Sequence, residues 1–138
     1  MVSMKCNQIL HFVRILRKLH VDKIIINLFY KSVLESGFNY SITAWYGKLT
    51  CKDKNKLGSI VKKAGKLGAE TISLDQLYQI GTMEQVSRIM KDVTHPLHNF
   101  YTYLRSGRRL ALPMQCTDRY RKSFVPKSIS LFNHISSL

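Results

Sequence analysis

The residues that could carry out catalysis are few and widely spaced in this chain. Its eight carboxylates never come closer than five residues to one another, although phosphoryl-transfer sites bring several carboxylates together on Mg²⁺. Asp22, Asp53 and Asp75 stand instead where helix caps are expected. The sequence contains no phosphate-binding Gly-rich loop, no G-x-S-x-G turn and no H-E-x-x-H motif. We therefore predict no catalytic residues and no enzymatic activity in this chain alone.

Metal ligation is the second chemistry to consider. His95 and His98 have the spacing of one helical turn, but Pro96 lies between them, so we expect turn or capping histidines. The three cysteines are 45 and 65 residues apart with no C-x-x-C pair, which argues against a disulfide framework and against a zinc knuckle. The sequence predicts no metal site and no cofactor.

Positive charge is the strongest binding signal. The chain has 22 Lys and Arg against 8 Asp and Glu, a formal charge of +14, which favours nucleic acid or an anionic membrane surface as partner. Near the C-terminus arginines alternate with aromatic residues. Guanidinium groups bind phosphates in bidentate fashion, and aromatic faces stack on unpaired bases for about 1–3 kcal/mol each. The candidate nucleic-acid-binding residues are Arg105, Arg108, Arg109, Arg119, Arg121, Lys122, Lys62, Lys63, Tyr101, Tyr103 and Tyr120.

One alternative to a nucleic-acid-binding arm is a basic tail whose tyrosines are structural. A membrane partner is a second alternative. The lysine-rich amphipathic segment 50–67 has only Leu, Ile, Val and Ala on its apolar stripe, without the Trp or Phe usual in membrane-binding helices. Segment 24–46 is apolar but carries Lys31 and Glu35 near its middle, which is costly for a membrane span. No continuous apolar run occurs before Lys5. We expect a nuclear or cytoplasmic protein, neither secreted nor transmembrane, with no membrane partner.

Helices are the elements that must position these residues. Apolar residues at helical spacing predict a first helix over 9–19 with Ile9, Phe12, Val13 and Leu16 on its buried face. A second helix should begin at its cap Asp22. We expect that helix to bury the residues Ile25, Phe29 and Val33, and to break at Gly37. Segment 38–46 could be strand or helix, and we favour helix because the flanking segments are helical.

Two capping boxes mark later helices. Thr50 with Asp53 predicts a helix over 50–67, and Ser73 with Gln76 predicts another, interrupted near Gly81 and ended by the His95-Pro96 pair. A last short helix runs from Pro126 to about residue 135. The predicted fold is all-α: a small helical bundle over residues 1–98, followed by a basic, irregular C-terminal arm with aromatic residues and a short terminal helix over 99–138.

An ordered set of segments resembles the region downstream of the polymerase core in LINE-type (non-LTR) retrotransposon reverse transcriptases. The segments are FVRILRK (12–18), LFYK (28–31), ITAWYG (42–47), DVTHPLH (92–98), LRSGRR (104–109) and TDRYRKSFVP (117–126). The resemblance implies RNA or DNA as partner and the nucleus as workplace. In that family the polymerase acids lie upstream, so it implies a non-catalytic fragment of an RNA-directed DNA polymerase. It adds the upstream polymerase domain as a further partner.

Two other interpretations stay open. Segment 8–49 resembles the short N-terminal segment of an AlkB-type tRNA-modifying protein, which couples a 2-oxoglutarate dioxygenase to a methyltransferase. In that family the segment precedes the catalytic domains and carries no iron or methyl-donor site. The chain could also be a protein-docking helical module without nucleic-acid binding, whose Phe38, Trp45 and Tyr46 form a patch for a partner domain.

Overall fold

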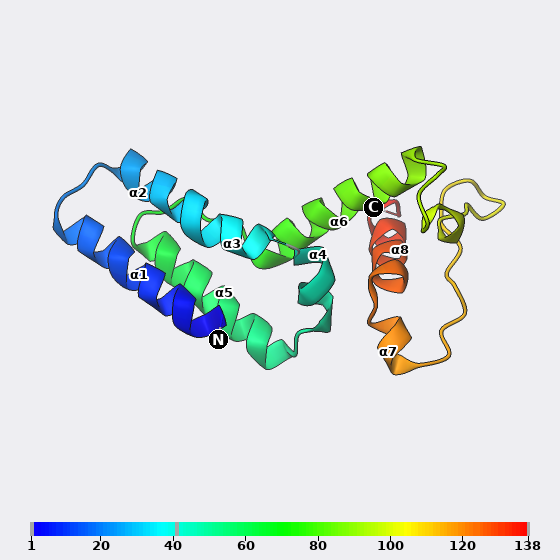
Figure 1. The fold of residues 1–138 in the computed structure, drawn as a ribbon, viewed down its shortest axis with the longest axis horizontal. Helices are drawn as coiled ribbons and strands as arrows, with labels where there is room; N and C mark the ends of the chain where they lie inside the picture. Colours follow the sequence, from blue (N-terminus) through cyan, green and yellow to red (C-terminus); the bar gives the residue numbers. More distant parts are fainter. Residues whose placement is uncertain (1, 41, 138) are drawn as a thin grey trace. The chain divides into compact units, whose positions relative to one another are not determined.

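The computed structural model describes residues 2–40 and 42–137 (Figure 1). Over these residues the chain is helical, and its only β-type pairing is a single antiparallel bridge between Tyr103 and Leu110. The predicted all-α fold with an irregular basic C-terminal segment is confirmed. Among the described helices, none has the length and apolar character needed to span a membrane. The elements are α1 (Val2–Lys18), α2 (Lys23–Phe29), a π-helical segment η1 (Tyr30–Glu35), α3 (Ser36–Asn39), α4 (Ile42–Trp45), a 3-10 turn η2 (Tyr46–Lys48), α5 (Cys51–Lys66), α6 (Leu74–Lys91), a 3-10 turn η3 (His98–Phe100), α7 (Asp118–Arg121) and α8 (Phe124–Ile135).

The chain divides into two compact units. The first unit comprises Met1–Ile42 and Leu49–Leu77, and the second comprises Thr43–Lys48 and Tyr78–Leu138. Helix α6 runs from the first unit into the second. The division of the sequence into a bundle over residues 1–98 and an arm over 99–138 stays a prediction.

In the first unit α1 packs against α5 and against the segment formed by α2 and η1 (Figure 1). The buried face of α1 is formed by Cys6, Leu10 and Val13, which are at most 6% exposed. A helix is confirmed here, but it runs from Val2 to Lys18 and not over 9–19. Of the residues assigned to its buried face Val13 is buried, Ile9 and Leu16 are half-buried, and Phe12 is 56% exposed. Phe12 and Val13 point about 100° apart on the helix, and the packing of α1 buries the side of Val13 and leaves that of Phe12 in solvent.

The segment α2–η1–α3 corrects the predicted buried face by one residue. The residues buried are Ile26, Tyr30, Leu34 and Phe38, whereas Ile25 and Val33 are exposed and Phe29 is only half-buried. Four-residue spacing drifts around an ideal α-helix, which has 3.6 residues per turn, and the wider π-helical turn of η1 compensates that drift. Gly37 does not break the helix, because it lies within α3. The cap at Asp22 is confirmed: its carboxylate accepts from the Ile24 N–H.

Helix α5 follows its prediction closely. The Asp53 N–H donates to Thr50 Oγ1 at 3.2 Å, and the buried stripe consists of Leu57, Ile60, Val61 and Ala64. The helix ends at Lys66 and is followed by Gly68, whose φ of +99° suits glycine. The Gly68 N–H donates to the Gly65 carbonyl and the Ala69 N–H to the Ala64 carbonyl, which are the paired hydrogen bonds of a Schellman motif. Segment 38–46 is helical, as we favoured, in α3 and α4 on either side of residue 41.

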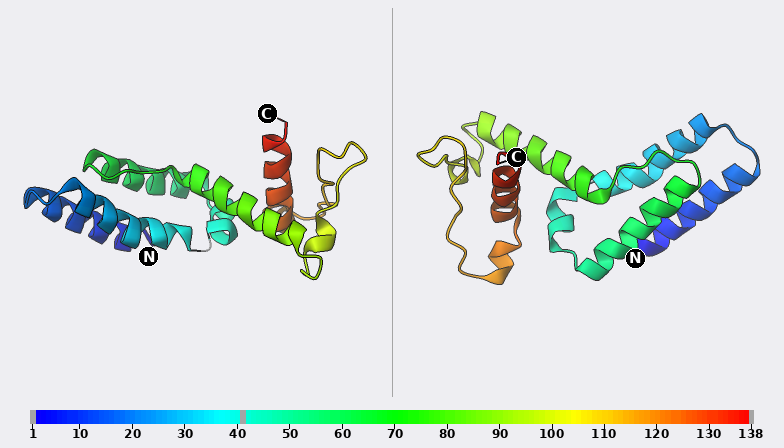
Figure 2. Two further views of the ribbon diagram at one scale, coloured as in Figure 1. Left: turned by 90° about the horizontal axis from the view of Figure 1, so that it is seen from above. Right: turned by 180° about the vertical axis from the view of Figure 1, so that it is seen from behind.

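In the second unit the C-terminal part of α6 packs on α8 (Figure 2). The capping box is confirmed, since Ser73 and Gln76 exchange hydrogen bonds between side chain and backbone N–H at 3.2 Å. The predicted interruption near Gly81 is wrong, and α6 ends at Lys91, before the His95-Pro96 pair. Helix α8 has Pro126 in its first turn and ends at Ile135, as predicted. The core of this unit consists of Val86, Ile89, Tyr101, Leu110 and Ile129.

Candidate nucleic-acid interface

Three of the predicted arginines lie on one ordered turn, which we name the arginine turn: Arg105, Arg108 and Arg109. The Leu104 N–H donates to the Arg109 carbonyl and the Gly107 N–H to the Leu104 carbonyl, both at 2.8 Å. Gly107 has a φ of +67°, which lets the chain reverse. All three arginines are exposed. The turn therefore presents three guanidinium groups on a defined backbone.

Helix α8 anchors this turn through Asn133. Its Oδ1 accepts from the Leu110 N–H at 2.7 Å, and its Nδ2 donates to the Leu110 carbonyl at 3.0 Å. Leu110 itself is 1% exposed. Because Leu110 directly follows Arg109, the last residue of the arginine turn is tied to the core.

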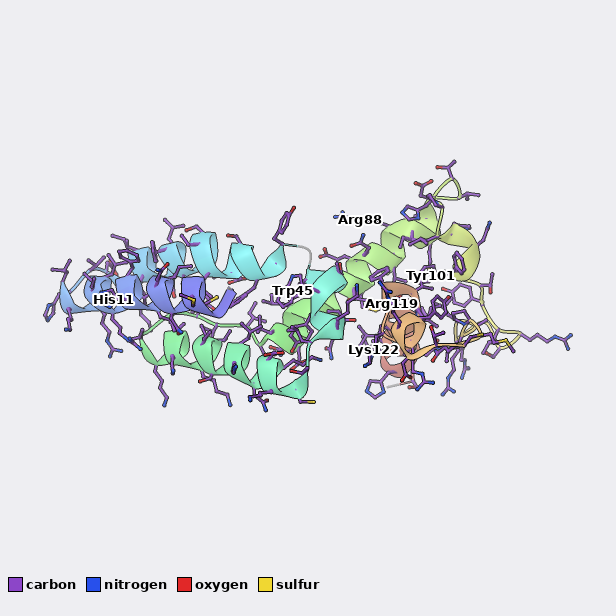
Figure 3. The ribbon with its side chains drawn as sticks, turned by 60° about the horizontal axis from the view of Figure 1, so that its bottom comes forward. His11, Trp45, Arg88, Tyr101, Arg119 and Lys122 are labelled. Carbon is purple, nitrogen blue, oxygen red and sulfur yellow. The ribbon has the colours of Figure 1, made fainter. Side chains whose placement is uncertain are left out.

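The three predicted tyrosines differ in their surroundings. Tyr101 is 5% exposed, and its hydroxyl lies 2.7 Å from Ser128 Oγ beside α8 (Figure 3). Burial raises the pKa of Tyr101 above its ordinary value. Tyr103 is 52% exposed, with its ring edge-on to Phe132 at 6.4 Å, and Tyr120 is half-buried. Tyr101 is a core residue, so we leave it out of the binding surface, and Tyr103 is the tyrosine whose ring faces solvent.

The remaining C-terminal cations gather at α7. Arg119 and Lys122 lie together there (Figure 3) and line, with Lys48 and Ser123, a hollow of about 410 Å³ that we name the α7 hollow. Arg121 forms an exposed ion pair with Asp118, with 3.3 Å between Nη1 and Oδ1. The structure thus brings Arg119 and Lys122 to one place and turns Arg121 toward a carboxylate.

Sequence reasoning missed Lys48 and Ser123. Lys48 carries no local signal, because it lies far from α7 along the chain and only the fold brings it there. Ser123 could have been found, since a serine three residues before Pro126 is a typical start of a helix.

The predicted lysines Lys62 and Lys63 belong to a separate basic face on α5 in the first unit. Both are exposed. Lys63 borders an open pocket of about 510 Å³ together with Lys52 and Lys56 from the same helix. This face has the character of a solvated lysine surface.

Most of the positive charge has no acidic counterpart. With 22 basic and 8 acidic residues, at least fourteen cations have no carboxylate available to them. Ion pairs join Arg121 to Asp118 and Lys31 to Glu70, the latter at 3.6 Å, and both are exposed to solvent. Exposed pairs of this kind are worth about 0–1 kcal/mol. The excess charge is therefore available to a polyanion.

Of the two histidines predicted to be turn residues, His95 has a turn contact and His98 contacts α6. His95 Nδ1 accepts from the Leu97 N–H at 3.1 Å, and His98 Nδ1 lies 3.0 Å from the Ile89 carbonyl, to which it can only donate. Within the described part of the chain, no three His, Cys, Asp or Glu residues group as metal ligands do. The cysteine thiols are free: Cys6 is buried, and Cys51 and Cys116 are exposed.

The patch predicted for protein docking is not a surface. Phe38 and Tyr46 are each 2% exposed, and Trp45 is half-buried. Large exposed apolar side chains lie elsewhere, on the outward faces of α1 and α2. Examples are Phe12 on α1, Leu19 directly after its end, and Ile24 and Leu28 on α2. The docking hypothesis therefore moves from Phe38, Trp45 and Tyr46 to these faces.

No protein-family model, curated protein sequence or solved structure matches the chain. The resemblances to LINE-type reverse transcriptases and to the AlkB-type modifying protein therefore stay predictions.

Proposed function

We propose that this protein binds RNA or single-stranded DNA and has no catalytic role of its own. The observation that carries the proposal is the arginine turn, which holds three exposed guanidinium groups next to the exposed ring of Tyr103 on a backbone tied to α8. Guanidinium groups neutralise phosphates, and an aromatic face stacks on an unpaired base. The fourteen surplus cations supply the long-range attraction.

The direct test replaces the arginines of the turn and measures affinity. A variant with Arg105, Arg108 and Arg109 changed to Gln should bind a single-stranded oligonucleotide of about 12 nucleotides at least about tenfold more weakly than wild type. The matched control removes three exposed cations of the first unit, Arg14, Lys18 and Lys23, and should weaken binding less. Equal losses in both variants would show that the turn has no special part.

We also propose that the chain derives from the C-terminal region of a LINE-type reverse transcriptase and works in the nucleus. The ordered resemblance and the excess positive charge support this origin. Sequencing the transcript upstream of Met1 tests it. An upstream frame that encodes a polymerase domain is the expected result, and an unrelated upstream frame would contradict it.

A second candidate function is docking to a partner protein, such as the upstream polymerase domain of that family. It is favoured by the exposed apolar side chains on α1, on α2 and in the turn between them. These side chains are 56–73% exposed: Phe12, Leu19, Ile24 and Leu28. Replacing Leu19 and Ile24 with Gln should abolish capture of that domain and leave oligonucleotide affinity unchanged. Loss of oligonucleotide binding in this variant would instead place the nucleic-acid surface on the first unit.

A further inference from the structure

Three cations and the start of a helix meet in the α7 hollow. Lys48, Arg119, Lys122 and Ser123 line its space of about 410 Å³, a volume in the range of small-ligand pockets, about 300–1,000 Å³. Lys48 comes from η2 and the other residues from α7 and the turn that follows it. A cluster of charges along one segment can arise without any tertiary structure. The lining of this hollow comes from two segments, which the fold of the second unit brings together.

Lys48 is held in position by the aromatic residues before it. Tyr46 is 2% exposed, and its ring lies 5.2 Å from that of Tyr78. Gly47 fits closely against the same tyrosine, since a Cβ there would come within 3.3 Å of the Tyr78 hydroxyl. The backbone of η2 is thereby fixed, and the base of the Lys48 side chain with it.

The start of α8 adds hydrogen-bond donors that the helix itself does not use. Ser123 is its N-cap residue, and its side chain makes no capping hydrogen bond. Phe124 and Val125 follow as the first helical residues, and Pro126 has no N–H. The N–H groups of such a first turn have no partner within the helix and carry the positive end of its dipole. Helix α8 has twelve residues, and the free N–H groups and dipole at its start favour an anion beside Ser123.

The cations of the α7 hollow lack carboxylate partners among the residues that the structure describes. Asp118, the acid of α7, pairs with Arg121. Lys48, Arg119 and Lys122 form no ion pair with a described acid. Three like charges at one hollow repel one another, so a bound anion stabilises the arrangement.

We propose that the α7 hollow binds a phosphomonoester dianion. A terminal phosphate carries a charge of about −1.5 to −2 at pH 7, which matches the three cationic residues of the lining better than the single charge of a backbone diester does. The group could belong to the 5′ end of a polynucleotide or to a free mononucleotide. The choice of a polynucleotide rests on the proposed function, but the phosphate site does not.

The test follows the amide signals of Phe124 and Val125 by NMR in the ¹⁵N-labelled full chain. Adenosine 5′-monophosphate should shift them in a saturable manner, and adenosine should not. Arg119→Gln should weaken this binding at least about tenfold, because it removes a charge-assisted contact. The matched control Arg14→Gln, at an exposed cation of the first unit, should leave it unchanged, and Lys48→Met should repeat the loss from the other segment. Circular dichroism checks that each variant is folded.

Oligonucleotides with and without a 5′-phosphate separate the two sources. If the polynucleotide is the source, the phosphorylated form should bind at least about tenfold more tightly than the hydroxyl form, and Arg119→Gln should remove the difference. Equal binding of both forms beside saturable nucleotide binding would support a mononucleotide site. Nucleotide binding without any oligonucleotide binding would refute the proposed function and retain the α7 hollow. Absence of saturable shifts with the nucleotide, or shifts that Arg119→Gln leaves unchanged, would overturn the proposal whatever the oligonucleotides do.

Discussion

Asn133 should matter for both stability and binding, because it joins the arginine turn to α8. Its amide makes two hydrogen bonds to the backbone of Leu110, at 2.7 and 3.0 Å, and Leu110 is 1% exposed. Asn133→Ala leaves one backbone donor and one acceptor without these partners. Leaving a buried polar group unsatisfied costs about 1–3 kcal/mol. Since water can reach part of this half-buried site, we expect the free energy of unfolding to fall by about 2–4 kcal/mol in total.

Urea denaturation followed by circular dichroism measures this change, and hydrogen exchange at the Leu110 amide locates it. Asn133→Asp should also lower stability, because a carboxylate still accepts from the Leu110 N–H but sets a second acceptor against the Leu110 carbonyl. Asn99→Ala, at an exposed position in η3, is the matched control and should change stability by less than about 0.5 kcal/mol. The reasoning fails if Asn133→Ala matches that control and the Leu110 amide exchanges at the wild-type rate.

Three further predictions use the same structure. Tyr101→Phe removes the contact with Ser128 and should lower the free energy of unfolding by about 1 kcal/mol without changing oligonucleotide affinity. Tyr103→Ala should weaken oligonucleotide affinity. A loss of affinity with Tyr101→Phe would contradict the assignment of Tyr101 to the core. Thr50→Ala removes the cap of α5 and should lower the free energy of unfolding in urea by about 1 kcal/mol, and an unchanged value would show that the cap is dispensable. Burial, with the nearby charge of Glu35, raises the pKa of Tyr30 to about 12. A raised pKa means that the folded state holds this proton more tightly, so this contribution to stability is intact below pH about 10 and falls as the pH rises toward 12. Tyr30→Phe should remove this part of the alkaline loss of stability, as measured by urea titrations at each pH. An equal alkaline loss in wild type and variant would contradict the role of Tyr30.

Helix starts were the most predictable part of the fold. Asp22, Thr50 and Ser73 cap helices as expected, because a capping side chain bonds to backbone N–H groups two or three residues away and needs no distant partner. The apolar stripe of α5 was equally readable, since lysines fill the rest of that helix and leave a single apolar face. These features depend on local sequence alone.

The errors arose where several faces of a helix are apolar or where distant contacts decide. Residues 24–26 are all isoleucine, so the pattern does not say which one is buried, and tertiary packing selects Ile26. A glycine costs a helix about 1 kcal/mol, and α6 continues through Gly81 because flanking residues such as Leu77 and Val86 are buried by packing.

The candidate site was predictable in composition but not in arrangement. Tyr101 and Tyr103 differ by only two positions, yet only Tyr101 reaches Ser128 on α8 and is buried. Arg119 lines the α7 hollow together with Lys48, whose position depends on the packing of Tyr46 against Tyr78. No pattern within one segment reports such a meeting.

The salt dependence of oligonucleotide binding tests the central claim most directly. If the surplus cations bind the phosphate backbone, the logarithm of affinity should fall linearly with the logarithm of salt concentration, by about 0.7 for each single-strand phosphate neutralised. Replacing the three arginines of the turn should therefore reduce the steepness by about 2. An affinity that does not change between dilute and physiological salt, or a slope that the arginine-turn variant leaves unchanged, would contradict the account.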